Sequence, residues 1–191
     1  MKYDIVLCGV GGQGGISVSV VIARAAMAAG LQVKQSEVHG MSQRGGEVLA
    51  HLRISDAPIA SPTIPKGRAD LILSFEPLEA LRYLPWLSKT GAVVSATAPL
   101  KNMPTYPENV EDILAELKAL PKAILIDADA IAKEAGNARA ANIVLVGAAA
   151  KYLPLKADAM EKAIADNFAR KGEAVVAANL KAFEHGRKAN P

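Results

Sequence analysis

A glycine-rich turn near the start of the chain has the spacing of an anion-binding loop. Residues 9–14 read Gly-Val-Gly-Gly-Gln-Gly, a G-x-G-x-x-G pattern between a β-favouring run and a helix-favouring one. Glycines let the backbone turn sharply and let a ligand approach its amides, and a helix start presents unpaired N–H groups to an anion. The sequence therefore predicts a cofactor-binding turn formed by Gly9, Gly11, Gly12, Gln13 and Gly14.

Two further roles are compatible with the same glycine spacing. In a dinucleotide-binding domain, Glu37 near the end of the second strand would bind a ribose hydroxyl, and the chain would be an independent NAD(P)-binding oxidoreductase. Alternatively, the glycines serve only close packing of a strand against a helix. The spacing alone leaves all three roles open.

A second loop, residues 36–47, contributes a cation and further glycines. Arg44 offers a donor fork suited to carboxylate or phosphate, Ser42 adds a short polar group, and Gly45 and Gly46 allow backbone amides to face a ligand. In a doubly wound sheet this loop lies at the carboxyl edge beside the first turn. We therefore expect Ser42, Arg44, Gly45 and Gly46 to share one crevice with that turn.

The histidines, the aspartates at 127 and 129 and the single cysteine do not form the pattern of a catalytic or metal site. His39 and His51 are interpreted as a loop histidine and a sheet-face histidine, and three scattered histidines make no zinc pattern. Asp127 and Asp129 are better explained as helix-capping acids than as cation ligands. With a single cysteine, Cys8, the chain has too few thiols for a disulfide or an iron–sulfur cluster. We expect no catalytic residue and no metal site in this chain.

The elements that must position these loops alternate between strands and helices. The pattern predicts strands at 3–8, 32–37, 48–54, 70–74, 91–96 and 123–127, with helices at 17–29, 77–84 and 109–120. After residue 128 only helices are predicted, at 138–152, 156–169 and 173–186, the first of them buried nearly all round. The expected fold is α/β: a Rossmann-like, doubly wound, mostly parallel sheet with a helical C-terminal third, in one domain spanning residues 1–191.

One strand has a pattern of its own. Residues 48–54 alternate Val48, Ala50, Leu52 and Ile54 with polar residues, which predicts a half-exposed strand near the sheet edge.

Composition limits the possible partners. The 191 residues carry a formal net charge of +3, too mild to indicate nucleic acid, and no apolar run approaches the length that spans a bilayer. The chain shows no leader-like segment. We therefore expect a cytoplasmic protein that binds neither nucleic acid nor membrane.

Taken together, the two loops resemble those of a known family. Residues 9–14 and the stretch Ser-Glu-Val-His-Gly-Met-Ser-Gln-Arg-Gly-Gly at 36–46 are similar to the gamma-type subunits of the 2-oxoacid:ferredoxin oxidoreductases. Residues 142–147 and 179–186 also resemble that family, so the similarity runs over nearly the whole chain. It is strongest to the small (beta) subunits of the indolepyruvate branch, because Val-His-Gly-Met at 38–41 replaces a tyrosine-containing version found elsewhere in the family.

The resemblance implies a division of labour between subunits. Such complexes oxidatively decarboxylate a 2-oxoacid to an acyl-CoA, with thiamine diphosphate and [4Fe-4S] clusters on a large partner subunit and ferredoxin as electron acceptor. This chain would hold no cofactor alone, and would form at least a heterodimer in which coenzyme A is a shared co-substrate. Asn142 would orient the loop from the buried helix. A purely structural role in the complex stays possible, and the resemblance does not identify the 2-oxoacid.

Overall fold

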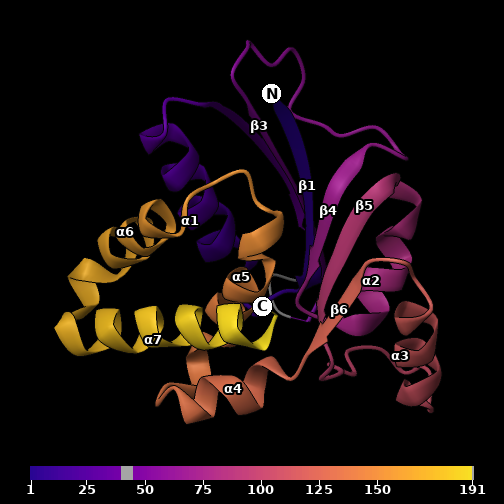
Figure 1. Cartoon of the computed structure of the whole chain (residues 1–191). Coiled ribbons are helices and arrows are strands. Elements are labelled where there is room, and N and C mark those ends of the chain that lie inside the picture. The colour runs from indigo at the N-terminus through magenta and orange to yellow at the C-terminus, as the bar shows by residue number, and fades with distance from the viewer. Residues whose placement is uncertain (40–44, 191) are drawn as a thin grey trace.

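A six-stranded sheet forms the centre of the molecule. The computed structural model describes residues 1–39 and 45–190, without the side chain of His39. The strand order is β2-β3-β1-β4-β5-β6. Figure 1 labels every strand except β2. The strand bounds are β1 Lys2–Val10, β2 Gln32–His39, β3 Glu47–Ser55, β4 Ala69–Ser74, β5 Leu87–Ala96 and β6 Ala123–Ile126.

Five strands share one direction and β3 opposes them. β4 pairs in parallel with β1 and with β5, and β5 pairs in parallel with β6, whereas β3 is antiparallel to both β1 and β2. After β1 the chain forms β2 and β3 on one side of β1. It then forms β4, β5 and β6 on the other side. The point where the direction of winding reverses lies between β1 and β4, where open α/β sheets place their ligands.

Helices cover both faces of the sheet. The apolar cluster on one face includes residues of α1, α4, α5, α6 and α7, and the cluster on the other includes residues of α2 and α3 (Figure 1). The bounds are α1 Gly15–Ala28, α2 Pro77–Tyr83, α3 Val110–Lys118, α4 Ala128–Glu134, α5 Ala141–Ala149, α6 Ala157–Phe168 and α7 Glu173–Ala189. Short 3₁₀ turns lie at Leu84–Trp86, Ala138–Ala140, Ala150–Tyr152 and Ala169–Lys171. The predicted fold class is confirmed.

The first helix begins directly from the glycine turn. Gly14 caps α1 in the left-handed region, at φ 84°, without a side-chain cap and without an acidic residue in the first turn. Its first N–H groups therefore have neither a capping side chain nor a nearby carboxylate of that turn to satisfy them. At the other end Gly30, at φ +78°, follows the helix and stops it in the left-handed region.

Strand β3 is not the half-exposed edge strand that its pattern predicts. It lies between β2 and β1, and both His51 and Arg53 are buried. The loop after β3 covers this face, since Arg53 donates to the carbonyls of Ser61 and Thr63 and pairs with the buried Asp4 carboxylate. Both faces of this strand are therefore buried. Its apolar residues lie in an apolar environment, and its polar residues lie in one where the Arg53 cation is paired with a carboxylate.

The buried helix of the C-terminal third packs closely against the last helix. α5 is buried over most of its length, as predicted, and contacts α7. Two glycines make this approach possible: a Cβ on Gly147 would lie 2.1 Å from the Phe183 carbonyl oxygen, and one on Gly186 would lie 2.0 Å from that of Val144. Over the described residues, no helix has both the length and the apolar character needed to cross a membrane.

Candidate functional site

The two glycine-bearing loops meet at the carboxyl end of β1. Gly11 N donates to the Gly46 carbonyl oxygen at 2.7 Å, and Gly45 N donates to the Gly11 carbonyl oxygen at 3.2 Å. These two bonds continue the antiparallel pairing of Val10 with Glu47 beyond the strands themselves. The predicted convergence of the two loops is therefore present in the described part of both.

The side-chain amide of Gln13 holds the turn through two hydrogen bonds to backbone groups. Its Oε1 accepts from Val10 N at 2.8 Å and its Nε2 donates to the Phe75 carbonyl oxygen at 2.9 Å. Phe75 follows the end of β4, so Gln13 ties the glycine turn to the neighbouring parallel strand. The amide that the sequence places at a ligand is engaged with the backbone of its own chain.

Asn142 of α5 also supports the turn. Its Nδ2 donates to the Gly14 carbonyl oxygen at 3.2 Å, from the first turn of α5. A Cβ on Gly14 would lie 2.5 Å from that same nitrogen. The close approach, together with the positive φ, explains why glycine occupies position 14.

A hollow of about 410 Å³ opens beside the turn, where α1 begins. Its walls include the glycine turn, the first residues of α1 (Gly15, Ile16 and Ser17), the β3 residues Val48 and Ala50, and Glu37 of β2. The start of α1 supplies the N–H groups and the partial positive charge that favour an anion, and the rest of the wall is mainly apolar. This arrangement suits a ligand that has both a phosphate and an apolar or amide-bearing part.

A second hollow, of about 440 Å³, lies on the other side of the same turn. It occupies the carboxyl ends of β4, β5 and β6 and shares Gly12 and Phe75 with the first. Asn142, Asp129 and Arg139 provide its polar wall. Arg139 carries no signal in the sequence, because it stands alone between alanines and in no motif.

The start of β3 is held in place by two further elements. Asn102 Nδ2 donates to the Gly45 carbonyl oxygen at 2.7 Å, from the segment between β5 and α3. The Tyr83 hydroxyl, at the end of α2, donates to Glu47 Oε1. The described end of the second loop is therefore fixed by α2, by the 97–109 segment and by the glycine turn.

Two buried glutamates, Glu76 and Glu79, lie where α2 meets the 97–109 segment. Glu76 caps α2 through Glu79 N, and its other oxygen accepts from Leu100 N and from the Tyr106 hydroxyl. Burial raises the pKa of Glu79 to about 7, against the opposing effect of the Arg82 guanidinium. Neither carboxylate lines either hollow, so both organise the scaffold rather than the ligand.

Several residues that the sequence set aside have structural roles. His51 is buried and accepts from Ile64 N at 3.2 Å, and Asp127 caps α4 by accepting from Ala130 N at 3.0 Å. Cys8 is buried, and burial raises the pKa of its thiol. Ser42 and Arg44 lie outside the described residues, so their predicted contribution stays a prediction.

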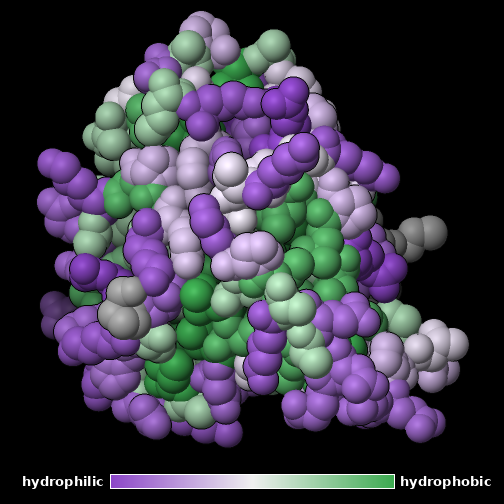
Figure 2. Space-filling view, turned by 45° about the vertical axis from the view of Figure 1, so that its right-hand side comes forward, coloured by the Kyte–Doolittle hydropathy of each residue, from purple (hydrophilic) through white to green (hydrophobic). Residues whose placement is uncertain are grey.

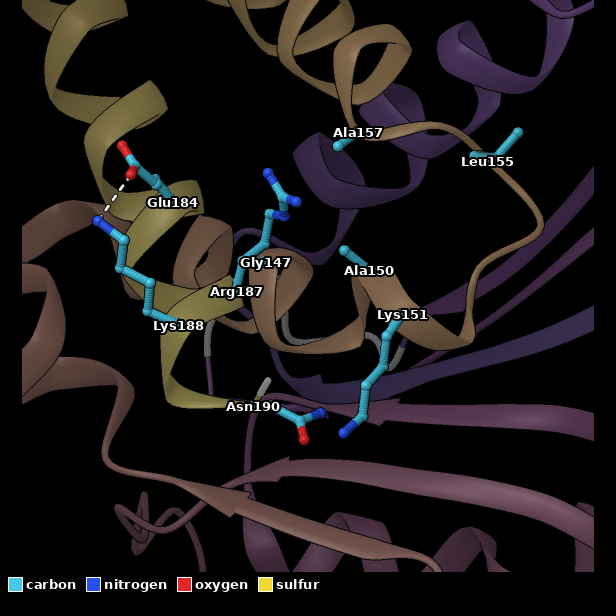
Figure 3. Close-up of a pocket in the computed structure, with 9 residues that line it drawn as sticks. All are labelled: Gly147, Ala150, Lys151, Leu155, Ala157, Glu184, Arg187, Lys188 and Asn190. Carbon is cyan, nitrogen blue, oxygen red and sulfur yellow. Dashed lines mark ion pairs between the residues drawn. The ribbon is translucent and has the colours of Figure 1, made fainter.

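A hollow of about 580 Å³ elsewhere on the molecule is a weaker candidate site (Figure 3). It lies between α5, α7 and the start of α6, and it presents Lys151, Arg187 and Lys188. Lys188 pairs with Glu184 at 2.7 Å and Arg187 pairs with Glu161 at 3.6 Å. Two of its cations are thus already neutralised, and it lies away from both loops.

Comparison with known proteins identifies the family. Residues 4–189 match the family described as pyruvate ferredoxin/flavodoxin oxidoreductase. The chain is 42% identical to the indolepyruvate oxidoreductase subunit IorB of Archaeoglobus fulgidus, over 97% of this chain and 94% of that protein. It is 33% identical to the common gamma subunit of the pyruvate/ketoisovalerate oxidoreductases of Pyrococcus abyssi, over 92% of each.

Solved structures agree with this assignment. The gamma subunit of a keto/oxoacid ferredoxin oxidoreductase from Geobacter sulfurreducens is 28% identical, with a TM-score of 0.72 over 98% of each chain. The 2-oxoglutarate:ferredoxin oxidoreductase of Magnetococcus marinus, solved with 2-oxoglutarate, coenzyme A and succinyl-CoA bound, shares the fold at 23% identity and a TM-score of 0.76; the match covers 99% of this chain and 31% of that one. The chain therefore belongs to the pyruvate ferredoxin/flavodoxin oxidoreductase family, as one of its gamma-type subunits.

Proposed function

We propose that this chain is the small subunit of an indolepyruvate-type 2-oxoacid:ferredoxin oxidoreductase, and that it helps to bind coenzyme A. The 42% identity to an indolepyruvate oxidoreductase subunit over nearly the full length of both chains supports the substrate class. Coenzyme A is bound in the 2-oxoglutarate enzyme that shares this fold, which supports the co-substrate.

One observation carries the proposal for the site. The glycine turn and the second loop are joined by two backbone hydrogen bonds at the point of the sheet where winding reverses. The adjoining hollow is lined by the uncapped start of α1, which suits the diphosphate of a coenzyme. The described lining of this hollow includes Glu37, Cys8 and Ser17 but no histidine or lysine that could serve as a base for either nucleophile, so we assign the chemistry to another polypeptide.

The residues of this chain do not fit the other cofactors of such a complex. A four-thiolate cluster needs four cysteines, and the chain has one, Cys8, which is buried. Among residues 1–39 and 45–190, no group of three or more His, Cys, Asp or Glu residues could hold the cation that accompanies a thiamine diphosphate. We therefore propose that the large partner subunit carries the thiamine diphosphate and the iron–sulfur clusters, and passes electrons to ferredoxin.

Exposed apolar side chains near the site offer a surface for that partner. Ile16 in the first turn of α1 is 53% exposed, and Val38 near the end of β2 is 59% exposed. Both lie at the end of the sheet where the loops meet. A further apolar strip, bordered by polar side chains, crosses the face in Figure 2. Uncovered apolar surface of this kind is typical of subunits that work in complexes.

Co-expression with the large subunit of the same organism's indolepyruvate oxidoreductase tests the proposal. We expect a stable complex that reduces ferredoxin with indolepyruvate only when coenzyme A is present, and no activity from the isolated chain. Activity of the isolated chain, or a large subunit that uses coenzyme A equally well without this chain, would contradict it. Exchanging indolepyruvate for pyruvate and for 2-oxoglutarate checks the substrate class.

One observation supports the alternative function, an independent NAD(P)-binding oxidoreductase. Glu37 does line the hollow beside the glycine turn, as a ribose-binding carboxylate would. Titration of the chain, alone and in the complex, with NADH, NADPH and coenzyme A separates the two functions. Tight binding of a nicotinamide nucleotide, with no response to coenzyme A, would favour the alternative.

A further inference from the structure

The two hollows beside the glycine turn differ in their charged residues: Glu37 lines the hollow at the start of α1, and Asp129 and Arg139 line the other. Among the described residues that line them, Arg139 is the only lysine or arginine, and it lies in the hollow away from the start of α1. Its side chain makes no ion pair within the described part of the chain. A guanidinium left without a carboxylate partner can form charge-assisted hydrogen bonds to a phosphate.

The two hollows meet the glycine turn at the same residue, Gly12. This residue lines both, and no atom of the described chain lies within 4 Å of the position that its Cβ would occupy. A long ligand can therefore pass over Gly12 close to the backbone. The start of α1 would then face one part of the ligand and Arg139 another.

The backbone that carries Arg139 is held firmly against the turn. Asn137 Oδ1 accepts from Arg139 N at 3.1 Å, and three residues later Asn142 donates to the Gly14 carbonyl oxygen at 3.2 Å. Arg139 and the glycine turn therefore keep a fixed relation to each other. The wall beside Arg139 is apolar, formed by Ala96, Ala98, Pro99 and Leu100, and it suits a purine ring.

We propose that Arg139 binds the ribose 3′-phosphate of coenzyme A, while the glycine turn and the start of α1 bind the diphosphate. This inference rests on the proposed function and assigns a second anion subsite to it. The adenosine end lies in the hollow of Arg139, and the pantetheine arm crosses Gly12 toward the other hollow. Arg139 therefore determines the preference for coenzyme A over dephospho-coenzyme A, which lacks that phosphate.

Steady-state kinetics of the reconstituted complex test the inference with both coenzymes. The unmodified complex should show a KM for dephospho-coenzyme A about tenfold above that for coenzyme A, since a charge-assisted phosphate contact is lost. Arg139→Gln should raise the KM for coenzyme A by about the same factor, with little change in kcat, and should leave the KM for dephospho-coenzyme A unchanged. Arg139→Lys should give a KM for coenzyme A between those of the unmodified complex and of Arg139→Gln.

The control is Arg170→Gln, which removes an exposed arginine that lines neither hollow. It should leave both KM values unchanged. If Arg139→Gln shifts both coenzymes equally, or neither, the inference is wrong while the proposed function stands. If the unmodified complex does not depend on coenzyme A, the proposed function fails and the inference fails with it.

Discussion

At the scale of single residues, two side-chain amides determine the shape of the glycine turn. Gln13 bridges Val10 N and the Phe75 carbonyl, and Asn142 donates to the Gly14 carbonyl. The types and spacing of these residues indicate a site, but only the folded chain shows that Gln13 faces inward. A sequence pattern identifies residues that meet at a turn without giving the direction of each side chain.

The bridging role of Gln13 predicts an unusual pH dependence for Gln13→Glu. A carboxylate can still accept from Val10 N but faces the Phe75 carbonyl oxygen without a proton, so the fold raises the pKa of the new group. The variant should therefore be nearly as stable as the unmodified chain at about pH 4, and should lose about 1–3 kcal/mol as the pH rises to 7. Urea denaturation across this range measures the difference. A difference that stays constant with pH would contradict the bridging role.

Glu79 gives a second pH prediction. Its folded-state pKa of about 7 lies above its ordinary value, so the folded chain holds the proton more tightly and stability falls as the pH rises between about 4.5 and 7. The slope is at most about 1.4 kcal/mol per pH unit. Glu79→Gln should flatten this part of the stability profile, while Glu116→Gln, at an exposed position on α3, should leave it unchanged. Parallel profiles for the Glu79 variant and the unmodified chain would count against this account.

At the scale of elements, the site depends on a segment with no regular structure. Asn102 holds the Gly45 carbonyl, and nothing in the sequence around residue 102 signals this contact with a loop 57 positions away. Long-range contacts of this kind depend on which strand lies beside which. The sequence predicts the elements well because periodicity is local, but it misplaces β3 at the edge because strand order is not local.

Asn102→Ala should loosen the second loop without unfolding the chain. The loss of one part-buried hydrogen bond costs about 1 kcal/mol of stability. In the reconstituted complex we expect a higher KM for coenzyme A than in the unmodified enzyme, and partial recovery with Asn102→Gln. An unchanged KM with the same loss of stability would show that the contact is only structural.

The crossing of α5 and α7 predicts two severely destabilised variants. A Cβ on Gly147 or Gly186 would overlap the carbonyl oxygen of the opposite helix, so either Ala substitution should cost about 3 kcal/mol or more. Gly30→Ala is the matched control, because its Cβ would meet no described atom within 4 Å and only the positive φ resists it, at about 1 kcal/mol. Thermal denaturation of the three variants ranks them; equal losses at all three positions would contradict the close crossing.

At the scale of the whole molecule, the proposed coenzyme site lies at one end of the sheet, where we propose that another polypeptide completes it. The two loops meet at the reversal of winding, the hollows lie on either side of Gly12, and exposed apolar residues border the same end. Membership of a family of multi-subunit oxidoreductases fits this incomplete site. The family could be identified from the two loops, whereas the position of Arg139 beside them required the fold.

Hydrogen–deuterium exchange of the reconstituted complex, with and without coenzyme A, tests most directly whether these loops form the coenzyme site. We expect coenzyme A to slow amide exchange in peptides that cover residues 9–18, 45–50 and 137–142, while peptides of α6 stay unchanged. Unaltered exchange in all three regions, in a complex that turns over with coenzyme A, would contradict the account.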